Sequence, residues 1–224
     1  YFERDTATSH YFFDGDEVGS FELGVKTPLF NGRAQLAVAA YFTDWQDMIL
    51  VHNDPLISNP LNIYNHNSGG AEIKGLELDF TAFVTERFSL RVAADYNDTE
   101  VTTASNNTTG YGRSEAGSEL IFSPPWSATI MLDYEIPMSN GWSLSLHADH
   151  AWVDAQWVDT TNAIELPSYK KAGARATARS GDGKWRVSLY GLNLNNEEIL
   201  SNIGGSNSYW QNPRQIGLEF GYKY

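Results

Sequence analysis

The amino-acid sequence predicts an all-β fold, an antiparallel transmembrane β-barrel, from three observations. Apolar and polar residues alternate with a period of two along most of the chain, the pattern of strands with two chemically different faces. The chain contains 7 Trp, 12 Tyr and 11 Phe. Many of these aromatic residues end the apolar rows, as in the girdles of membrane barrels. Short turns also alternate with longer polar loops, an asymmetry typical of such barrels.

Turn-forming residues divide the chain into nine expected strands. Residues 1–16 have the character of the end of a preceding external loop or strand. The expected strands are residues 17–27, 33–51, 62–84, 88–101, 118–136, 142–157, 166–179, 185–194 and 213–224. Several exceed the roughly 9–11 residues that a tilted strand needs to cross a bilayer, which fits strands that project beyond the membrane.

Four of the expected strands show the alternation most clearly. Their apolar rows begin at Phe88, Trp126, Trp142 and Ile216 and continue at every second residue. The intervening positions carry mainly Ser, Thr, Asp, Arg, Glu and Gly. Aromatic residues lie at the ends of these rows and aliphatic residues between them, so each row fits a lipid-facing band.

The connections fall into two classes. Short turns are expected at residues 28–32, 85–87, 137–141 and 180–184, and longer loops at 52–61, 102–117, 158–165 and 195–212. If the strands alternate in direction, the last strand ends on the side of the short turns. This is the periplasmic side in outer-membrane barrels.

Composition excludes several classes of protein. The 15 basic and 28 acidic residues give a net charge of −13, which argues against nucleic-acid binding because neutralising phosphates requires clustered Lys and Arg. The absence of cysteine excludes disulfides and thiolate metal sites. No apolar run approaches the roughly 18 residues of a membrane helix.

The strand count predicts an incomplete barrel. Single-chain bacterial barrels have an even number of strands, and an open sheet leaves unpaired backbone groups in lipid. We therefore expect residues 1–224 to form one partial barrel domain, a fragment that aggregates or forms an unclosed sheet in isolation.

No catalytic, metal or cofactor site is expected. His147 and Asp149 with Asp154 are residue types found in metal or hydrolase sites, but alternation places His147 and Asp149 on the polar face, where such residues occur anyway. Ser145 beside His147 has no recognisable oxyanion element, and the glycines around Tyr111 lack the strand–turn–helix context of a nucleotide motif.

Two groups of residues are candidates for binding. Charged residues at inward positions are expected to face the lumen and either to contact a plug or to form a hydrated wall; these are Glu77, Asp79, Arg91, Asp95, Arg175 and Arg179. Aromatic residues in the loops are candidate ligand contacts, although a girdle explains some of them equally well; these are Tyr111, Trp157, Tyr209 and Trp210.

Several local patterns, in order over about 200 residues, resemble the C-terminal half of TonB-dependent receptors. Phe21-Glu22-Leu23-Gly24-Val25-Lys26 and Asn67-Ser68-Gly69-Gly70-Ala71-Glu72-Ile73-Lys74-Gly75-Leu76-Glu77 are similar to two recurrent strands of this family. Pro125-Trp126, Leu166-Pro167-Ser168-Tyr169, Asn193-Leu194-Asn195-Asn196 and Pro213-Arg214 are similar to its later strand boundaries.

The resemblance implies about nine C-terminal strands of a 22-stranded barrel, with the plug and the TonB-contacting segment elsewhere in the protein. It implies TonB-dependent uptake of a ferric siderophore or a similar scarce nutrient across a Gram-negative outer membrane, with the TonB-ExbB-ExbD system as partner. The row Phe220, Tyr222 and Tyr224 resembles the signal that engages the barrel assembly machinery, although a lipid-facing girdle also explains it.

Three alternatives remain open at this point. The first is a passive porin-like channel, and the second is an outer-membrane barrel enzyme or adhesin. The third is a soluble all-β binding domain, which predicts a chain that stays monodisperse without detergent.

Overall fold

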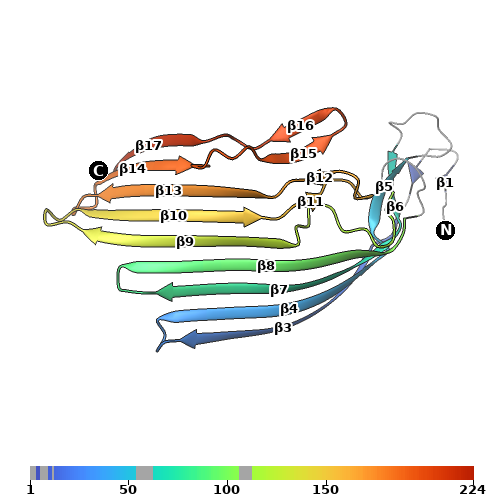
Figure 1. Ribbon diagram of the computed structural model, residues 1–224, viewed down its shortest axis with the longest axis horizontal. Coiled ribbons are helices and arrows are strands. Elements are labelled where there is room, and N and C mark those ends of the chain that lie inside the picture. The colour runs from blue at the N-terminus through green and yellow to red at the C-terminus, as the bar shows by residue number, and fades with distance from the viewer. Residues whose placement is uncertain (1–3, 6–9, 12, 54–62, 106–112) are drawn as a thin grey trace.

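The computed structural model describes residues 4–5, 10–11, 13–53, 63–105 and 113–224. Regular structure in these residues is entirely β (Figure 1). Within the same ranges, no helix is long and apolar enough to cross a membrane.

Nine long strands form one antiparallel sheet in the order β17-β14-β13-β10-β9-β8-β7-β4-β3. Each of them therefore pairs with the long strands that precede and follow it in the chain. Their bounds are β3 (Glu17–Leu29), β4 (Ala34–Gln46), β7 (Gly70–Phe83), β8 (Phe88–Thr103), β9 (Trp126–Pro137), β10 (Ser143–Val153), β13 (Tyr169–Arg179), β14 (Trp185–Leu192) and β17 (Gln215–Tyr222). The nine expected strands and their antiparallel arrangement are confirmed.

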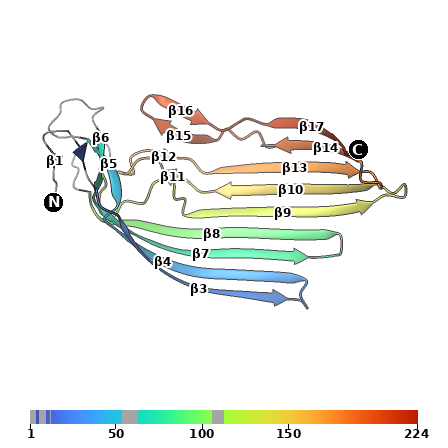
Figure 2. The same cartoon turned by 180° about the vertical axis from the view of Figure 1, so that it is seen from behind.

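Four two-stranded elements extend beyond one end of this sheet (Figures 1 and 2). They pair β1 (Arg4–Asp5) with β2 (His10–Tyr11), β5 (Ile49–Asn53) with β6 (Ile63–Asn67), β11 (Gln156–Trp157) with β12 (Glu165–Leu166), and β15 (Leu200–Gly204) with β16 (Asn207–Trp210). We call this end the long-loop end. The opposite end, where four tight turns join the long strands, is the short-turn end.

Several strand boundaries differ from the sequence-based expectation. In the expected strands 142–157 and 166–179, the long strands end at Val153 and begin at Tyr169. The expected strands 33–51 and 62–84 each break, because Asp47 and Gly69 adopt positive φ angles of 52° and 91°. The backbone beyond this break continues as the separate pair β5 and β6. The strand expected from residue 118 begins only at Trp126.

The segment 195–212 was expected to be a long loop, and it does connect β14 to β17, but it also contains strands that the sequence did not indicate. It contains the β15–β16 hairpin, whose register shifts between Leu200 and Asn202. The polar and glycine-rich residues 204–208 form the tip of this hairpin. Their composition is typical of a loop, and it therefore hides the strand pairing of the residues on either side.

Cross-strand register gives the sheet two chemically different faces. One row of paired residues runs through Val25, Val38, Leu78, Ala94 and Ala128. A parallel row on the same face contains Leu90, Leu132, Ala148, Ala174, Gly191 and Ile216. We call this the apolar face, and the side carrying the alternate residues the polar face.

No layer covers the apolar face in the part of the chain that the structure describes. Its large side chains are therefore open, and Leu23, Ile216 and Phe220 are each about 70% exposed. Most of the buried apolar residues, including Met48, Ala71 and Val101, lie at the long-loop end, and Ala34 is buried at the short-turn end. Backbone ladders and cross-strand side-chain pairs thus hold the sheet together, without a two-layer core.

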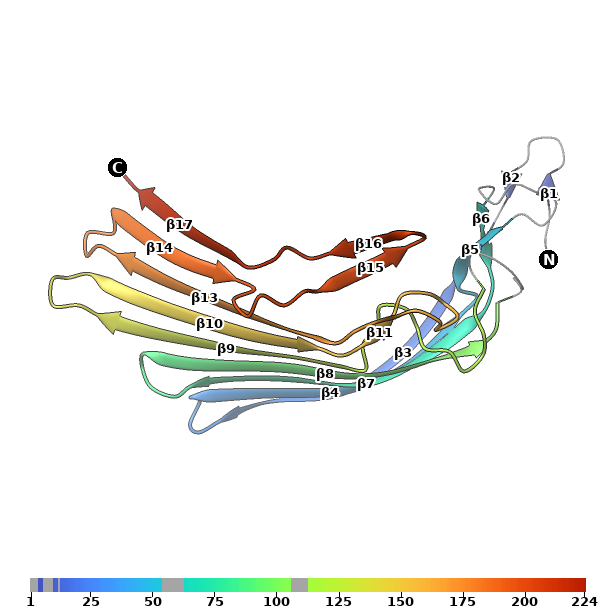
Figure 3. The ribbon, with the colours of Figure 1, turned by 45° about the horizontal axis from the view of Figure 1, so that its top comes forward.

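The sheet is curved along the direction in which its strands follow one another (Figure 3). Its outermost strands, β3 and β17, each pair with a single strand of the sheet. The described sheet is therefore an open, curved wall.

Candidate functional site

The polar face carries all six charged residues that were expected to face a lumen. Glu77 and Asp79 lie on β7, where Glu77 pairs directly with Asp95 of β8. Arg91 lies on the same face of β8, and Arg175 and Arg179 occupy that face of β13. The structure thus brings these residues onto one surface, and their assignment to a lumen remains a prediction.

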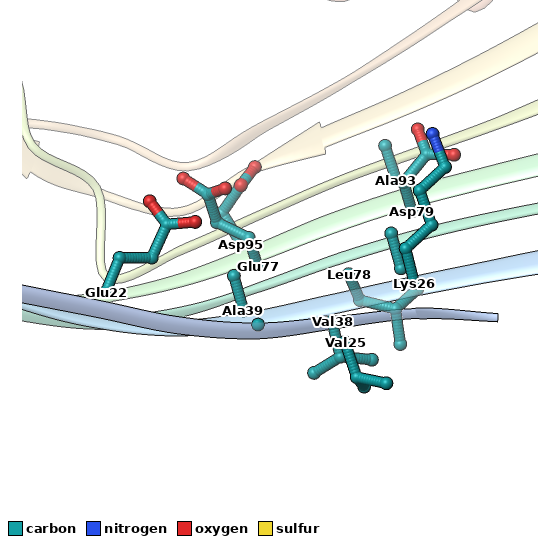
Figure 4. Close-up of a pocket in the computed structure, with 12 residues that line it drawn as sticks. Glu22, Val25, Lys26, Val38, Ala39, Glu77, Leu78, Asp79, Ala93 and Asp95 are labelled. Carbon is teal, nitrogen blue, oxygen red and sulfur yellow. The ribbon is translucent and has the colours of Figure 1, made fainter.

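An acidic groove of about 510 Å³ lies on the polar face across β3, β4, β7 and β8. Glu22, Glu77 and Asp95 point to one side of the sheet, whereas Val25 and Val38 point to the other (Figure 4). Asp95 accepts a hydrogen bond from Ser127 at 2.9 Å. Among the described residues, none of these three carboxylates forms an ion pair, so the groove has a negative local potential.

Nearer the short-turn end of the same groove, basic side chains balance the negative charge. Asp79 accepts two hydrogen bonds from Arg91, from Nη2 at 2.5 Å and from Nε at 3.1 Å. Lys26 lines the groove beside Asp79 (Figure 4). Charge on this wall is therefore segregated along the strands.

Two tyrosines of the polar face lie against glycines on the neighbouring strand. A Cβ atom added to Gly75 would be 2.3 Å from the ring of Tyr41, and one added to Gly217 would be 2.3 Å from the ring of Tyr190. The Tyr41 hydroxyl donates to Asn97 Oδ1 at 3.2 Å. Glycine at these two positions therefore makes the space that each ring occupies.

Arginines concentrate on the polar face of the C-terminal strands. Arg175 of β13 reaches across β14 to Glu219 of β17 at 3.0 Å, and Arg186 contacts the other oxygen of Glu219. The Arg175 guanidinium also lies 4.7 Å from the centre of the Tyr190 ring. Arg179 donates to the Ser145 hydroxyl at 3.2 Å. The Glu219 carboxylate therefore links β17 to both β13 and β14.

His147 contacts two carboxylates, with Nδ1 at 2.8 Å from Asp133 and Nε2 at 3.5 Å from Asp149. All three residues lie on the polar face. Within the described residues, no group of His, Cys, Asp and Glu has the geometry to hold a metal ion. The cluster is thus a set of polar contacts on the wall.

Sequence reasoning missed several residues of this surface as candidates. Glu22, Lys26 and Glu219 occupy polar-face positions, and the period-two alternation was a signal that identifies each of them. Tyr41 and Tyr190 carried no such signal, because their contacts with glycine depend on the register between strands.

The candidate loop aromatics lie in two separate elements. Trp157 is half-buried in β11, and its carbonyl oxygen accepts a hydrogen bond from the Phe122 amide at 2.9 Å. Tyr209 and Trp210 lie in β16 and are 52% and 57% exposed. Tyr111 lies outside the described residues.

Two loops at the long-loop end are fixed to each other through Asn162. Its Oδ1 accepts from the Glu119 amide at 2.6 Å, and its Nδ2 donates to the Glu119 carbonyl at 3.0 Å. The Thr160 hydroxyl donates to the Arg113 carbonyl in the same region. The loops that follow β8 and β10 thus form one hydrogen-bonded platform.

Asp159 organises the second of these loops. Its carboxylate accepts from the amides of Ile164 at 2.7 Å, Ala163 at 3.0 Å and Thr161 at 3.1 Å, and from the Thr161 hydroxyl. Burial alone would raise the pKa of Asp159, but these hydrogen bonds to the ionised form hold its pKa below the usual value of 3.8.

The C-terminal aromatics lie at the short-turn end. Phe220 and Tyr222 are on the apolar face, and the Tyr222 ring centre is 4.6 Å from that of Trp185. Tyr224 follows β17, with its ring centre 6.5 Å from that of Tyr222. A role of this row in barrel insertion remains a prediction.

Comparison with known sequences identifies one family. The family described as TonB dependent receptor-like, beta-barrel matches residues 18–196. The chain is 31% identical over 163 residues to the metal-pseudopaline receptor CntO of Pseudomonas aeruginosa, covering 70% of this chain and 20% of that receptor. It is 25% identical over 165 residues to the ferrioxamine receptor of Yersinia enterocolitica, covering 70% of this chain and 21% of that receptor. The chain thus spans about a fifth of the length of these relatives.

Solved structures show the same fold. The ferric yersiniabactin uptake receptor FyuA of Yersinia pestis matches with a TM-score of 0.75 and 18% identity, covering 93% of this chain and 30% of that one. The siderophore receptor PiuA of Acinetobacter baumannii also matches with a TM-score of 0.75, at 21% identity, covering 92% and 28%. The relatives and the fold are those of transport receptors and not of enzymes.

Proposed function

Because this chain belongs to the TonB-dependent receptor family, within its β-barrel domain, we propose that it supplies barrel wall and external loops to an active outer-membrane transporter. The transported molecule is a ferric siderophore or a similar large, scarce nutrient. The observation that carries this proposal is the family match over residues 18–196, supported by relatives whose names describe receptors for metal-pseudopaline and ferrioxamine.

The two faces of the sheet have different environments in this proposal. The apolar face contacts outer-membrane lipid, and the polar face lines the lumen of a 22-stranded barrel. The long-loop end lies outside the cell, and the short-turn end lies in the periplasm. The exposed apolar side chains support this arrangement, because lipid solvates them where water would not.

The polar face supplies one wall of the uptake path. Glu77 and Asp95 of the acidic groove, together with Arg175 and Arg179 nearer the C-terminus, contact the plug or the passing ligand. The plug region of the whole protein connects to the TonB-ExbB-ExbD system, which delivers inner-membrane energy. The barrel assembly machinery inserts the barrel and recognises Phe220, Tyr222 and Tyr224.

Uptake of iron-55 chelates by cells that carry or lack the full gene tests the transport function. We expect the deletion strain to lose uptake of at least one ferric chelate, and a protonophore or loss of TonB to have the same effect in the parent strain. Uptake that depends on the gene but not on energy would identify a passive channel instead.

Cysteine labelling tests the orientation, with the unsubstituted full receptor as the control for cysteines outside these 224 residues, which contain none. Ser201→Cys at the long-loop end should react with a membrane-impermeant maleimide on intact cells expressing the full receptor. Ser139→Cys at the short-turn end should react only after the outer membrane is permeabilised. The reverse labelling pattern would contradict the proposed orientation.

A further inference from the structure

We propose that a groove at the base of the β15–β16 hairpin recognises a protonated amine or quaternary ammonium group on the ligand. The groove has a volume of about 340 Å³ and lies at the long-loop end. Its lining residues are Asn196, Glu197, Glu198, Ile199, Trp210, Gln211 and Pro213. The proposal rests on the proposed function, because it names the chemistry of a ligand that first meets the external loops.

The groove combines the two groups that attract an organic cation. Trp210 presents an indole that is 57% exposed, and indole faces bind ammonium groups more strongly than other aromatic rings do. Glu197 and Glu198 belong to the same lining and bring two negative charges to it, and Glu197 Oε2 lies 3.5 Å from Asn195 Nδ2. Within the described residues, neither carboxylate forms an ion pair with the chain itself.

The charge of the lining is entirely negative. Two nearby cations, Lys171 and Arg214, do not line the groove. The Lys171 ammonium instead donates to Gln211 Oε1 at 3.0 Å. An anionic group entering the groove would meet two carboxylates, whereas a cationic group would replace its lost hydration with carboxylate contacts.

Hydrogen bonds hold both walls of the groove in place. Asn193 is buried, and its Nδ2 donates to the Glu197 carbonyl at 2.9 Å and to the Asn212 carbonyl at 3.3 Å. Its Oδ1 accepts from the Glu197 amide at 2.9 Å. Asn196 Oδ1 accepts from the Arg214 amide at 3.2 Å. The groove is therefore preformed, so binding does not require the chain to order these walls.

A backbone hydrogen bond between Ile199 and Gln211 joins the two segments that line the groove. Ile199 is 2% exposed, and its carbonyl accepts from the Gln211 amide at 2.9 Å. Ile199 and Pro213 give the lining apolar side chains besides the Trp210 indole. The alkyl carbons next to an ammonium group can therefore contact Pro213 and the indole while the charge faces the carboxylates.

Fluorine NMR of the full receptor in detergent, labelled with 5-fluorotryptophan, tests the proposal. Trp210→Leu identifies the Trp210 resonance by its disappearance. We expect n-butylammonium chloride to shift this resonance saturably, and 1-butanol at equal concentration to leave it unchanged. The absence of a shift, or an equal shift with both probes, would overturn the proposal.

Substitution of the two carboxylates gives the second test. Glu197→Gln combined with Glu198→Gln should raise the half-saturating concentration of n-butylammonium at least about fivefold. Glu165→Gln, which removes an exposed carboxylate outside the groove, is the matched control and should change nothing. Equal saturation of the double variant and the control would refute the role of the carboxylates.

The two hypotheses fail separately in these experiments. A receptor that imports a ferric chelate but shows no selective ammonium shift disproves only the groove proposal. A receptor that binds n-butylammonium at Trp210 but imports no chelate disproves only the transport function.

Discussion

At the scale of single residues, two tyrosine rings of the polar face pack against glycines of the neighbouring strands. Tyr41 and Tyr190 each occupy the place where the neighbouring strand would carry a Cβ atom. Each ring therefore lies over the backbone of the neighbouring strand. This arrangement joins adjacent strands through side chains as well as through backbone ladders.

Gly75→Ala in the full receptor should therefore destabilise the barrel by about 1–3 kcal/mol, since the new methyl group meets the Tyr41 ring and the Tyr96 carbonyl. Urea-dependent unfolding followed by tryptophan fluorescence measures this change. Gly19→Ala is the matched control, because a Cβ atom there meets nothing within 4 Å. An unchanged unfolding midpoint for Gly75→Ala would contradict the packing described.

The Asp159 carboxylate makes the loop of residues 158–165 sensitive to acid. Its folded pKa lies below the unfolded value, so its contribution to loop stability is complete above about pH 4 and is lost as the pH falls through the folded pKa. Asp159→Asn should remove this dependence, and at pH 6 it should speed amide hydrogen exchange at Ala163 and Ile164 roughly tenfold. Equal exchange in both proteins would show that the carboxylate does not hold the loop.

The polar-face charges could be predicted individually because alternation alone assigns a residue to a face. Arg91 and Arg175 are examples, since both share the polar face with the other expected residues. Their partners were not predictable. The contact between Arg175 and Glu219 crosses an intervening strand, and sequence alone does not give the register that aligns them.

At the scale of elements, the two loops joined through Asn162 behave as one unit. Asn162 itself adopts a positive φ of 53°, which asparagine tolerates better than most residues do. Its side chain satisfies both backbone groups of Glu119. The loops are therefore held in one arrangement before any ligand arrives.

Asn162→Ala should separate these loops by removing both hydrogen bonds to Glu119. We expect trypsin to cut the folded receptor after Arg113 several-fold faster, because the Arg113 backbone then loses its position against Thr160. Asn140→Ala in a tight turn at the other end is the control and should leave cleavage at Arg113 unchanged. The same rate in both variants would mean that Asn162 does not hold the platform together.

The sequence predicted a strand correctly where one face carries a continuous apolar row and the other a continuous polar row. The long strands β8, β9 and β10 were recognisable because their apolar and polar rows are continuous. The β15–β16 hairpin was not, since Tyr209 and Trp210 are both exposed and the pair leaves no apolar row to detect. Short elements that project from a sheet carry little periodic signal.

At the scale of the whole molecule, an added charge should destabilise the apolar face far more than the polar face. Ile130 lies on the apolar face between Trp126 and Tyr134, and Thr129 lies beside it on the polar face. In the full receptor, Ile130→Arg should cost about 2–4 kcal/mol of unfolding free energy in lipid vesicles, and Thr129→Arg should cost much less. Equal costs would contradict the assignment of the apolar face to lipid.

The antiparallel order of the sheet has a consequence for how such a wall can change over generations. Every long strand pairs only with its neighbours along the chain, with no crossover anywhere in the described sheet. Insertion or loss of one hairpin therefore changes only the strand pairings on its two sides and leaves every other pairing in register. The circumference of such a wall can thus evolve in steps of two strands, while each existing loop keeps the strands that support it.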